Sequence, residues 1–408
     1  MDVSFYTNFS NSLMQQEAQI NTLQEQIASG VTVQTPDQNP AAFETATLGD
    51  DQVAQLTNDN ATQATIQSQL GSVSDAYTSA TNLFNSVQSV LEDALNGTSS
   101  SQNLSALASQ VKEAETQLQA IGNTTAPNGT YLFGGSRGGL APFQSSGSGN
   151  IVYMGDGGQS SAAISSDTSA STIANGEVFV SGLSGNGVGT VTAGTTTTPN
   201  TGTGQLIAQG TASASAAATF QSSPTPASDI TLTFQAGTNG GTTYTASQNG
   251  TTLSTGAVTS NMTLQLGGVN YELTGTPAAN DSFTIAPSRP QSAFALLQNI
   301  YTALSGAGSS ASQVAQTNQV LNQSLASLSQ YQQGVITAQA QTAVTLQAIN
   351  NASTSNTNES TQVQTSVTNA TAVNTPVAMA NLDEALTSVQ AAMKTFGDVQ
   401  SLSLFTYL

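Results

Sequence analysis

Apolar residues recur every three or four positions near the start of the chain, over residues 5–27. This spacing predicts an amphipathic helix with one apolar stripe, in which Gln16 fills a missing position. Gly30 is a typical C-terminal stop, and Pro36 and Pro40 prevent the helix from continuing. The stripe consists of Phe5, Phe9, Leu13, Ile20, Leu23 and Ile27.

A regular alternation of three and four residues predicts two further helices, over about residues 41–95 and 104–121. Asn96-Gly97 ends the first of them, and Gly122-Asn123 ends the second. In the helix over residues 41–95, the apolar row (here called the seam) keeps the a and d spacing of a coiled coil for more than three heptads. This indicates packing against other long helices. The members of the seam are Ile66, Leu70, Val73, Tyr77, Ala80, Phe84, Val87 and Leu91.

The pattern changes in the middle of the chain, where residues 144–288 contain no Lys or Arg and are rich in Gly, Ser and Thr. Short β-prone runs alternate there with turn signals at residues 238–241, 249–250 and 267–268, which predicts one or two small antiparallel β domains. Residues 182–210 contain few large apolar side chains, so we expect a loop-like or mobile segment there. The predicted strands cover residues 177–180, 230–234, 262–266, 270–273 and 282–285.

Helical periodicity returns after Pro290. It runs over residues 294–304 and 314–335, and it thins over the Asn-, Ser- and Thr-rich residues 350–372. A stripe of large apolar residues then predicts a C-terminal amphipathic helix. This stripe contains Leu382, Leu386, Val389, Met393 and Phe396, and the last residues add Leu402, Leu404 and Phe405.

Each end of the chain therefore carries an apolar stripe that no adjacent hairpin covers. We expect the first helix to pair with the last, and the pair to pack against neighbouring subunits, which makes the two terminal stripes the candidate assembly interface. Without neighbours, the gain from burial only matches the entropy lost on ordering. The ends are thus expected to be poorly ordered in the free monomer, and proteolysis should leave a core of about residues 41–349.

These patterns predict an α+β fold, in which both chain ends form a long, coiled-coil-like helical bundle around an inserted antiparallel β-rich region. We expect assembly helices at residues 1–40 and 350–408. A helical rod domain is expected from residues 41–143 and 289–349. Residues 144–288 are expected to form the inserted outer β domain or domains.

The charge balance excludes several classes of function. The chain has four basic residues against 23 acidic ones, a net charge of −19, so it repels nucleic-acid backbones. It lacks His and Cys, which removes His-based catalytic triads, thiol chemistry and disulfides and leaves few ligands for zinc. No apolar run is long enough to span a membrane, and the first residues lack the pattern of a signal peptide. A surface with 7% charged residues suits an exported protein that packs against its own copies, although a habitat or genome bias would give the same composition.

Candidate catalytic and ligand-binding patterns are weak. Adjacent acids at residues 50–51, 92–93 and 383–384 lie in predicted helices, where neighbouring side chains diverge by about 100°, so we interpret them as solvated surface. The glycine-rich residues 134–139 follow a helix and lack the ending of a phosphate loop, which favours a hinge. Residues 156–158 are interpreted as a turn, without the repeated acidic ligands of a calcium site. We therefore expect no enzyme activity, no catalytic residues, no cofactor and no metal site.

Several passages resemble the bacterial flagellin family, and within it the flagellin-like hook-associated proteins. Residues 23–30 read LQEQIASG and residues 35–42 read TPDQNPAA, similar to the family's first helix and the proline-bounded turn after it. Residues 128–136 read NGTYLFGGS and the chain ends in LSLFTYL, and both resemble the hook-associated members more than filament flagellins. A softer match is LTGTPAANDSFTI at residues 273–285. The family's basic residue after Ser-Gly is Val31 here, which weakens any claim of an ionic contact near the turn.

The resemblance implies a structural protein of the bacterial flagellum at the junction between hook and filament. It implies a homo-oligomeric ring that contacts a hook-side junction protein of the FlgK type and flagellin. It also implies type III export without a cleaved signal peptide, and an export chaperone of the FlgN type that covers the C-terminal stripe. The alternatives are a filament flagellin and, from a different class, a surface adhesin carried on the β insertion.

Overall fold

The computed structural model describes residues 3–96, 100–147, 149–158, 160–165, 168–195, 197–222, 228–237 and 240–405, without the side chains of residues 3, 5 and 400–405. The chain divides into two compact units. The terminal unit consists of Met1–Gln63, Ile164–Ser166 and Asn350–Leu408. The central unit consists of Ala64–Ala163 and Asp167–Ile349.

Long helices form most of both units. The predicted helices at residues 5–27, 41–95, 104–121 and 294–304 are confirmed, with bounds within a few residues. The expected single segment over residues 350–408 is instead divided, because its first part continues α6 and α7 begins only at Thr375. The short helix α4 was not predicted. The two longest, α2 and α6, contribute residues to both units. The helices are α1 (Val3–Ser29), α2 (Pro40–Leu95), α3 (Ser101–Gly122), α4 (Ala214–Gln221), α5 (Ala293–Ser305), α6 (Ala311–Thr371) and α7 (Thr375–Phe405), with short 3₁₀ turns η1 (Gly135–Arg137) and η2 (Gly176–Phe179).

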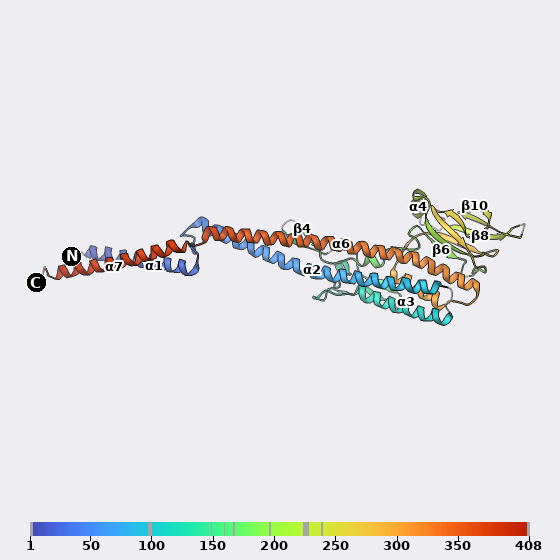
Figure 1. Cartoon of the computed structure of the whole chain (residues 1–408), viewed down its shortest axis with the longest axis horizontal. Coiled ribbons are helices and arrows are strands. Elements are labelled where there is room, and N and C mark those ends of the chain that lie inside the picture. Colours follow the sequence, from blue (N-terminus) through green and yellow to red (C-terminus); the bar gives the residue numbers. More distant parts are fainter. Residues whose placement is uncertain are drawn as a thin grey trace. The chain divides into compact units, whose positions relative to one another are not determined.

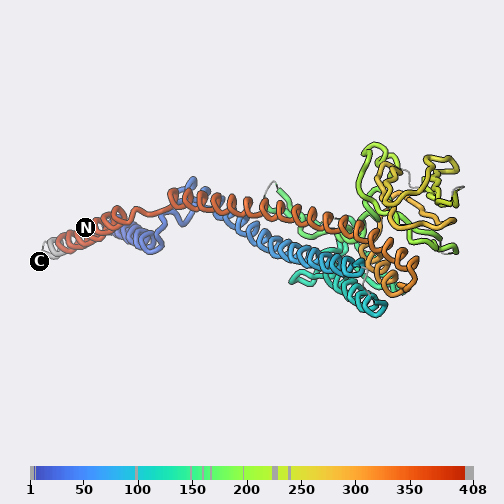
Figure 2. The backbone as a smooth tube through the Cα atoms, turned by 45° about the vertical axis from the view of Figure 1, so that its right-hand side comes forward, coloured from blue at the N-terminus to red at the C-terminus, as the bar shows by residue number. Residues whose placement is uncertain are grey.

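In the terminal unit, α1 lies beside α7 (Figures 1 and 2). The ring of Phe9 stacks on that of Phe396 with centroids 4.3 Å apart. Near the other end of the pair, the backbone N–H of Thr32 donates to the carbonyl of Thr371 at 2.7 Å. The predicted pairing of the first helix with the last is thus confirmed.

The helical core of the central unit is built from α2, α3, α5 and α6, with α3 lying along α5. The predicted seam of α2 is confirmed within this unit, because its residues from Val73 to Leu91 are buried. Aromatic rings fill the space beside this seam. The largest fully buried side chains of this core are Phe84, Phe133, Phe143, Phe179, Phe294, Leu91, Leu118, Leu132 and Tyr331.

The β-rich region of the central unit contains a five-stranded antiparallel sheet in the order β10-β9-β8-β13-β6 and a three-stranded sheet in the order β11-β12-β7. Their inner faces share one apolar core. The strands are β6 (Gly189–Ala193), β7 (Gln205–Thr211), β8 (Ile230–Ala236), β9 (Thr242–Gln248), β10 (Thr251–Ala257), β11 (Met262–Leu266), β12 (Val269–Thr274) and β13 (Ser282–Pro287). Shorter strands are β1 (Phe143–Ser145), β2 (Ile151–Tyr153), β3 (Ser161–Ser165), β4 (Thr168–Ser171), β5 (Gly182–Leu183) and β14 (Pro290–Gln291).

Two of the predicted hairpin turns are confirmed by their backbone angles. Asn249 and Gly250 have φ values of 48° and 76°, and Gly267 and Gly268 have φ values of 55° and 78°. Positive φ at both central residues is the requirement of a type I′ turn, which matches the twist of the flanking strands. In the third predicted turn, residues 238 and 239 lie outside the described part of the chain.

Two predictions about the middle of the chain are wrong. Residues 177–180 were expected to be a strand, but they lie largely in η2, because the side chain of Asn175 accepts the N–H of Glu177 at 2.8 Å and caps a helical turn. Residues 182–210 were expected to be loop-like, but they contain β5, β6 and most of β7. Strand pairing overrides the weak local pattern there, since β6 pairs with β13 and β7 with β12.

Glutamine side chains on α6 form hydrogen bonds with the backbone of the edge strands of both sheets. The amide of Gln319 accepts from the N–H of Leu206 at 2.7 Å and donates to its carbonyl at 2.9 Å. Four residues further along α6, the Oε1 atom of Gln323 accepts from the N–H of Val191 at 3.1 Å. These amides bind the open edges of β7 and β6 as a neighbouring strand would.

Candidate assembly surface

The inner stripe of α1 faces α7. Leu13, Leu23 and Ile27 are half-buried and Ile20 is buried, while Phe9 stacks on Phe396. Gln16 occupies the predicted slot in the stripe, where its Nε2 atom lies 3.3 Å from the Ser388 hydroxyl of α7. The side chain of Phe5 lies outside the described part of the structure. The described α1 stripe therefore packs within the chain, and it does not by itself mark a surface for another subunit.

The stripe of α7 is divided between two faces. Leu382, Val389 and Phe396 are half-buried, and Ala385 and Ala392 fill the seam between them. Leu386 and Met393 were predicted in the same stripe, but they are 38% and 53% exposed. The small alanines let the two helices approach, and the large residues at the neighbouring positions remain outside. The side chains of Leu402, Leu404 and Phe405 lie outside the described residues.

Large apolar side chains remain exposed on the terminal unit after α1 and α7 have paired. Soluble chains tolerate single exposed apolar residues, but a group of them on one small unit is typical of an interaction surface. Several of these residues were not predicted from the sequence, because they fall outside the main stripe of each helix. The described members are Tyr6, Met14, Leu48, Val377, Met379, Leu386, Met393 and Val399.

Polar groups interrupt the interior of the terminal unit. Gln63 and Asn356 are buried, yet within the described part of the structure the Oε1 atom of Gln63 and the Nδ2 atom of Asn356 have no hydrogen-bond partner. The Oε1 atom of Gln16 is also buried without a hydrogen-bond partner among the described residues. A buried polar atom without a partner lowers stability by about 1–3 kcal/mol. Among the described residues, buried atoms without a partner also occur in the central unit, at Asp229 and Tyr271, but they lie outside its helical core.

A close approach of α2 and α6 in the terminal unit depends on a glycine. A Cβ atom on Gly49 would collide with the side chain of Val367 and come within 3.3 Å of Val363. Nearby, the Gln52 amide donates to the Glu359 carboxylate at 2.7 Å. This contact could not be predicted from the sequence, since a glycine within a helical pattern indicates only a locally weaker helix.

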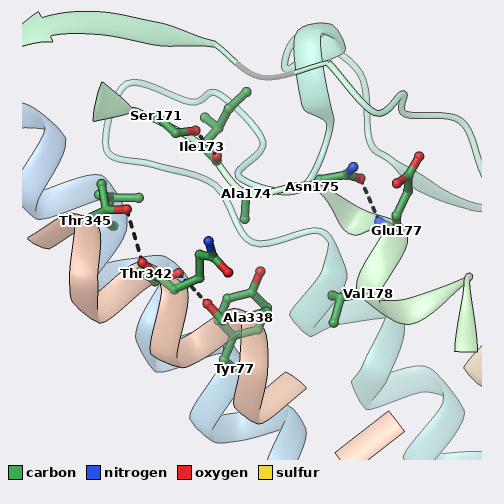
Figure 3. Close-up of a pocket in the computed structure, with 12 residues that line it drawn as sticks. Tyr77, Ser171, Ile173, Ala174, Asn175, Glu177, Val178, Ala338, Thr342 and Thr345 are labelled. Atoms are coloured by element: carbon green, nitrogen blue, oxygen red, sulfur yellow. Dashed lines mark hydrogen bonds between the residues drawn. The ribbon is translucent and has the colours of Figure 1, made fainter. Parts of the chain in front are cut away.

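The central unit contains a cavity of about 430 Å³ between α2, α6 and the segment before η2 (Figure 3). Its lining presents the Tyr77 phenol, the Glu177 carboxylate and several amides and hydroxyls, among them Asn175 and Thr342. Burial raises the pKa of Tyr77 far above its ordinary value, so the phenol stays protonated. This lining offers hydrogen bonds to a ligand but brings no nucleophile and base together.

The other candidate motifs have structural roles. The acids at residues 50–51, 92–93 and 383–384 are all exposed on helices. Gly135 has a φ of 63°, a left-handed conformation that favours glycine. The Asp156 carboxylate accepts the N–H of Ser136 at 2.7 Å and its hydroxyl at 2.5 Å, and these bonds lower the pKa of Asp156.

The described residues offer neither a metal-binding cluster nor a membrane-spanning helix. They contain no group of three or more acidic side chains placed to hold a metal ion. No helix among them has the length and apolar character needed to cross a lipid bilayer.

Comparisons with known proteins relate the chain to components of the bacterial flagellum. Residues 4–137 match the family model of the bacterial flagellin N-terminal helical region. The crystal structure of FlgL from Xanthomonas campestris is 26% identical, with a TM-score of 0.69, and the match covers 78% of this chain and 99% of that one. Flagellar hook-associated protein 3 from Legionella pneumophila shares the fold, with 22% identity and a TM-score of 0.71 over 79% of this chain and 98% of that one. No curated protein sequence matches the chain significantly.

The family match spans α1, α2 and α3, whereas the structural match extends over more than three quarters of the chain. About the first third of the chain thus matches the bacterial flagellin N-terminal helical region in sequence, and most of the chain is similar in fold to FlgL from Xanthomonas campestris.

Proposed function

We propose that this protein is a structural component of the bacterial flagellum that joins the hook to the flagellin filament. The observation that carries the proposal is the α1–α7 pair, which retains exposed apolar side chains such as Leu386 and Met393 after it has formed. A single chain gains nothing from such a surface, whereas a ring of copies buries it. The similarity to FlgL supports this assignment.

The finer parts of the proposal concern the partners. Copies form a ring through their terminal units, with a hook-side protein of the FlgK type on one side and flagellin on the other. The chain reaches this position through the flagellar type III export channel, without a cleaved signal. In this proposal, residues 1–40 and 350–408 are the assembly segments. Residues 41–143 and 289–349 form the rod, and residues 144–288 form an outer domain that decorates it.

Deletion of the gene tests the function directly. Cells that lack a junction protein are expected to build hooks and to release unassembled flagellin into the medium, and the wild-type gene should restore filaments. Hooks without any exported flagellin would instead indicate a filament flagellin. Normal filaments in the deletion strain would contradict both functions and would leave surface binding by the β insertion as the role to test.

The assembly surface has its own test in paired variants. Leu386→Glu adds a charge to the exposed apolar face of α7, and Thr395→Glu adds the same charge at an exposed polar position on the other side of the same helix. We expect the first variant to lose filament attachment at least tenfold and the second to retain it. Equal attachment of both variants would contradict the assignment of this face.

An export chaperone of the FlgN type is the proposed partner before assembly. The same exposed residues of α7 would cover an apolar groove of the chaperone. Full-length protein retained in the cytosol should capture the chaperone, and Leu386→Gln together with Met393→Gln should weaken this capture. If wild-type protein captures no chaperone from the cognate cytosol, the shielding proposal fails, although the junction function stands.

A further inference from the structure

We propose that Asn249 is the site of a spontaneous covalent modification, the deamidation of its side chain through a cyclic imide formed with the backbone nitrogen of Gly250. The inference is independent of the proposed function and concerns the tip of the hairpin between β9 and β10. It is carried by a comparison of the Asn-Gly pairs that the structure describes, because hydrogen bonds hold the reacting groups in the other pairs.

An Asn-Gly pair can react with itself when its conformation allows it. The backbone nitrogen of glycine attacks the Cγ atom of asparagine, since glycine has no side chain to block the approach. The new N–Cγ bond replaces the bond from Cγ to the amide nitrogen, which leaves as ammonia. Water then opens the five-membered imide at either carbonyl and gives aspartate or isoaspartate. The chain contains six such pairs, at residues 96–97, 128–129, 175–176, 186–187, 239–240 and 249–250, of which residues 97 and 239 lie outside the described part.

Hydrogen bonds occupy both reacting groups of the pair at residues 128–129, although this pair is exposed. The Oδ1 atom of Asn128 accepts the N–H of Thr130 at 3.1 Å. The N–H of Gly129 donates to the carbonyl of Ala126 at 2.8 Å. Both bonds must break before the glycine nitrogen can reach Cγ, so this pair reacts slowly in the folded state.

The pairs at residues 175–176 and 186–187 are held in the same way. The Oδ1 atoms of Asn175 and Asn186 each accept a backbone N–H, at 2.8 and 2.9 Å. The N–H groups of the two glycines donate to backbone carbonyls at 3.2 and 3.4 Å. Both asparagines are also partly buried, which limits the access of water.

Asn249 and Gly250 combine exposure with unbound reacting groups. Within the described part of the chain, neither the Asn249 amide nor the Gly250 N–H has a hydrogen-bond partner, and both residues are exposed. The space beside Gly250 is open, because a Cβ atom there would meet nothing within 4 Å. Rotation of the Asn249 side chain therefore brings Cγ toward the glycine nitrogen without the loss of a hydrogen bond.

The two products differ in their effect on the hairpin. Aspartate adds one negative charge but keeps the backbone, and Asp tolerates the positive φ of 48° at this position. Isoaspartate routes the backbone through the former side chain and so lengthens the turn. Because the turn sets the register of the flanking strands and β10 lies at the edge of its sheet, isoaspartate should loosen β10.

Peptide mass spectrometry of full-length protein, aged at mildly alkaline pH, tests the site. We expect Asn249 to deamidate at least tenfold faster than Asn128 in the folded protein. The two rates should become similar in urea, where no hydrogen bond distinguishes the pairs. Both asparagines are exposed, so the difference in the folded protein isolates the effect of the bonds. Equal rates in the folded protein would overturn the proposal.

Hydrogen exchange tests the effect on the hairpin. Aged protein that contains isoaspartate should exchange faster in β10 than fresh protein, with no change in α3. Asn249→Asp is the matched control, because it carries the charge without the longer backbone, and we expect it to exchange like fresh protein. Equal protection of β10 in aged and fresh protein, or faster exchange in Asn249→Asp, would contradict the effect assigned to isoaspartate.

Discussion

Gly49 and Gly71 lie on the same helix, but their surroundings are opposite. A Cβ atom at Gly49 would collide with Val367, whereas a Cβ atom at Gly71 would meet nothing within 4 Å. Alanine in a helix is favoured over glycine by about 1 kcal/mol, so the local preference is the same at both positions. Only the tertiary contact differs between them.

Gly49→Ala is therefore expected to destabilise the terminal unit, because the collision outweighs the gain in helix propensity. Gly71→Ala is the matched control, and we expect it to raise stability by up to about 1 kcal/mol. Thermal unfolding followed by circular dichroism measures both. If Gly49→Ala also raised the melting temperature, the close approach of α2 and α6 would be wrong.

Asp156 gives a prediction about pH. Its pKa is lowered by the side-chain and backbone hydrogen bonds from Ser136, so the folded state favours the ionised form. A lowered folded pKa contributes stability that is present above the unfolded pKa and is lost as the pH falls through the folded pKa. Wild-type stability should thus fall below about pH 4.

The variant Asp156→Asn should reduce that acid dependence, and Asp383→Asn serves as a matched loss of one exposed carboxylate from α7. Melting temperatures between pH 2 and pH 6 provide the measurement. The interpretation fails if Asp156→Asn and wild type show parallel curves over this range.

At the scale of elements, the amides of α6 replace missing strands at the edges of two sheets. Gln319 is 2% exposed and bonds both backbone groups of Leu206. Gln319→Leu keeps the approximate volume but leaves a buried N–H and a buried carbonyl unpaired, which lowers stability by about 1–3 kcal/mol for each group. Gln319→Glu retains the acceptor but places a buried carboxylate oxygen against the Leu206 carbonyl, so it should be at least as damaging at neutral pH.

Hydrogen exchange should detect this loss as faster exchange in β7 and β12, with little change in α3. A control is Gln333→Leu, which changes an exposed residue of the same helix. Unchanged protection of β7 in Gln319→Leu would show that the sheet does not depend on this contact.

The helices were predictable because their apolar spacing follows the 3.6-residue period over many turns. The seam from Val73 to Leu91 is an example, since each member is buried as expected. Strands such as β6 were not predictable, because Gly and Thr dominate them and their pairing comes from residues far along the chain. Glutamines inside α6 read as solvent-facing positions, so their bonds to the sheet edges gave no sequence signal.

The candidate surface was only partly predictable for a related reason. The α7 pattern predicted one stripe that contains Leu386 and Met393, but Ala385 and Ala392 occupy the seam instead. Periodicity indicates which residues are apolar on one side of a helix. It does not indicate which edge of a wide stripe faces the partner helix, because that depends on how close the two backbones lie.

At the scale of the whole molecule, stability is expected to be uneven. The α1–α7 pair has no aromatic core like that of the central unit, and the neighbouring seams contain buried polar atoms such as those of Gln63 and Asn356. Limited proteolysis of the monomer should therefore trim both ends and leave a fragment of about residues 41–349. Termini that resist protease in a monomeric sample would show that the pair is stable without neighbours.

The central claim is that the protein sits at one level of the flagellum, between hook and filament. Immunogold labelling of intact flagella with an antibody against residues 144–288 tests it most directly, because this region is proposed to face outward. The account predicts a single band of gold at the boundary between hook and filament. Label along the whole filament, or none on the flagellum, would contradict it.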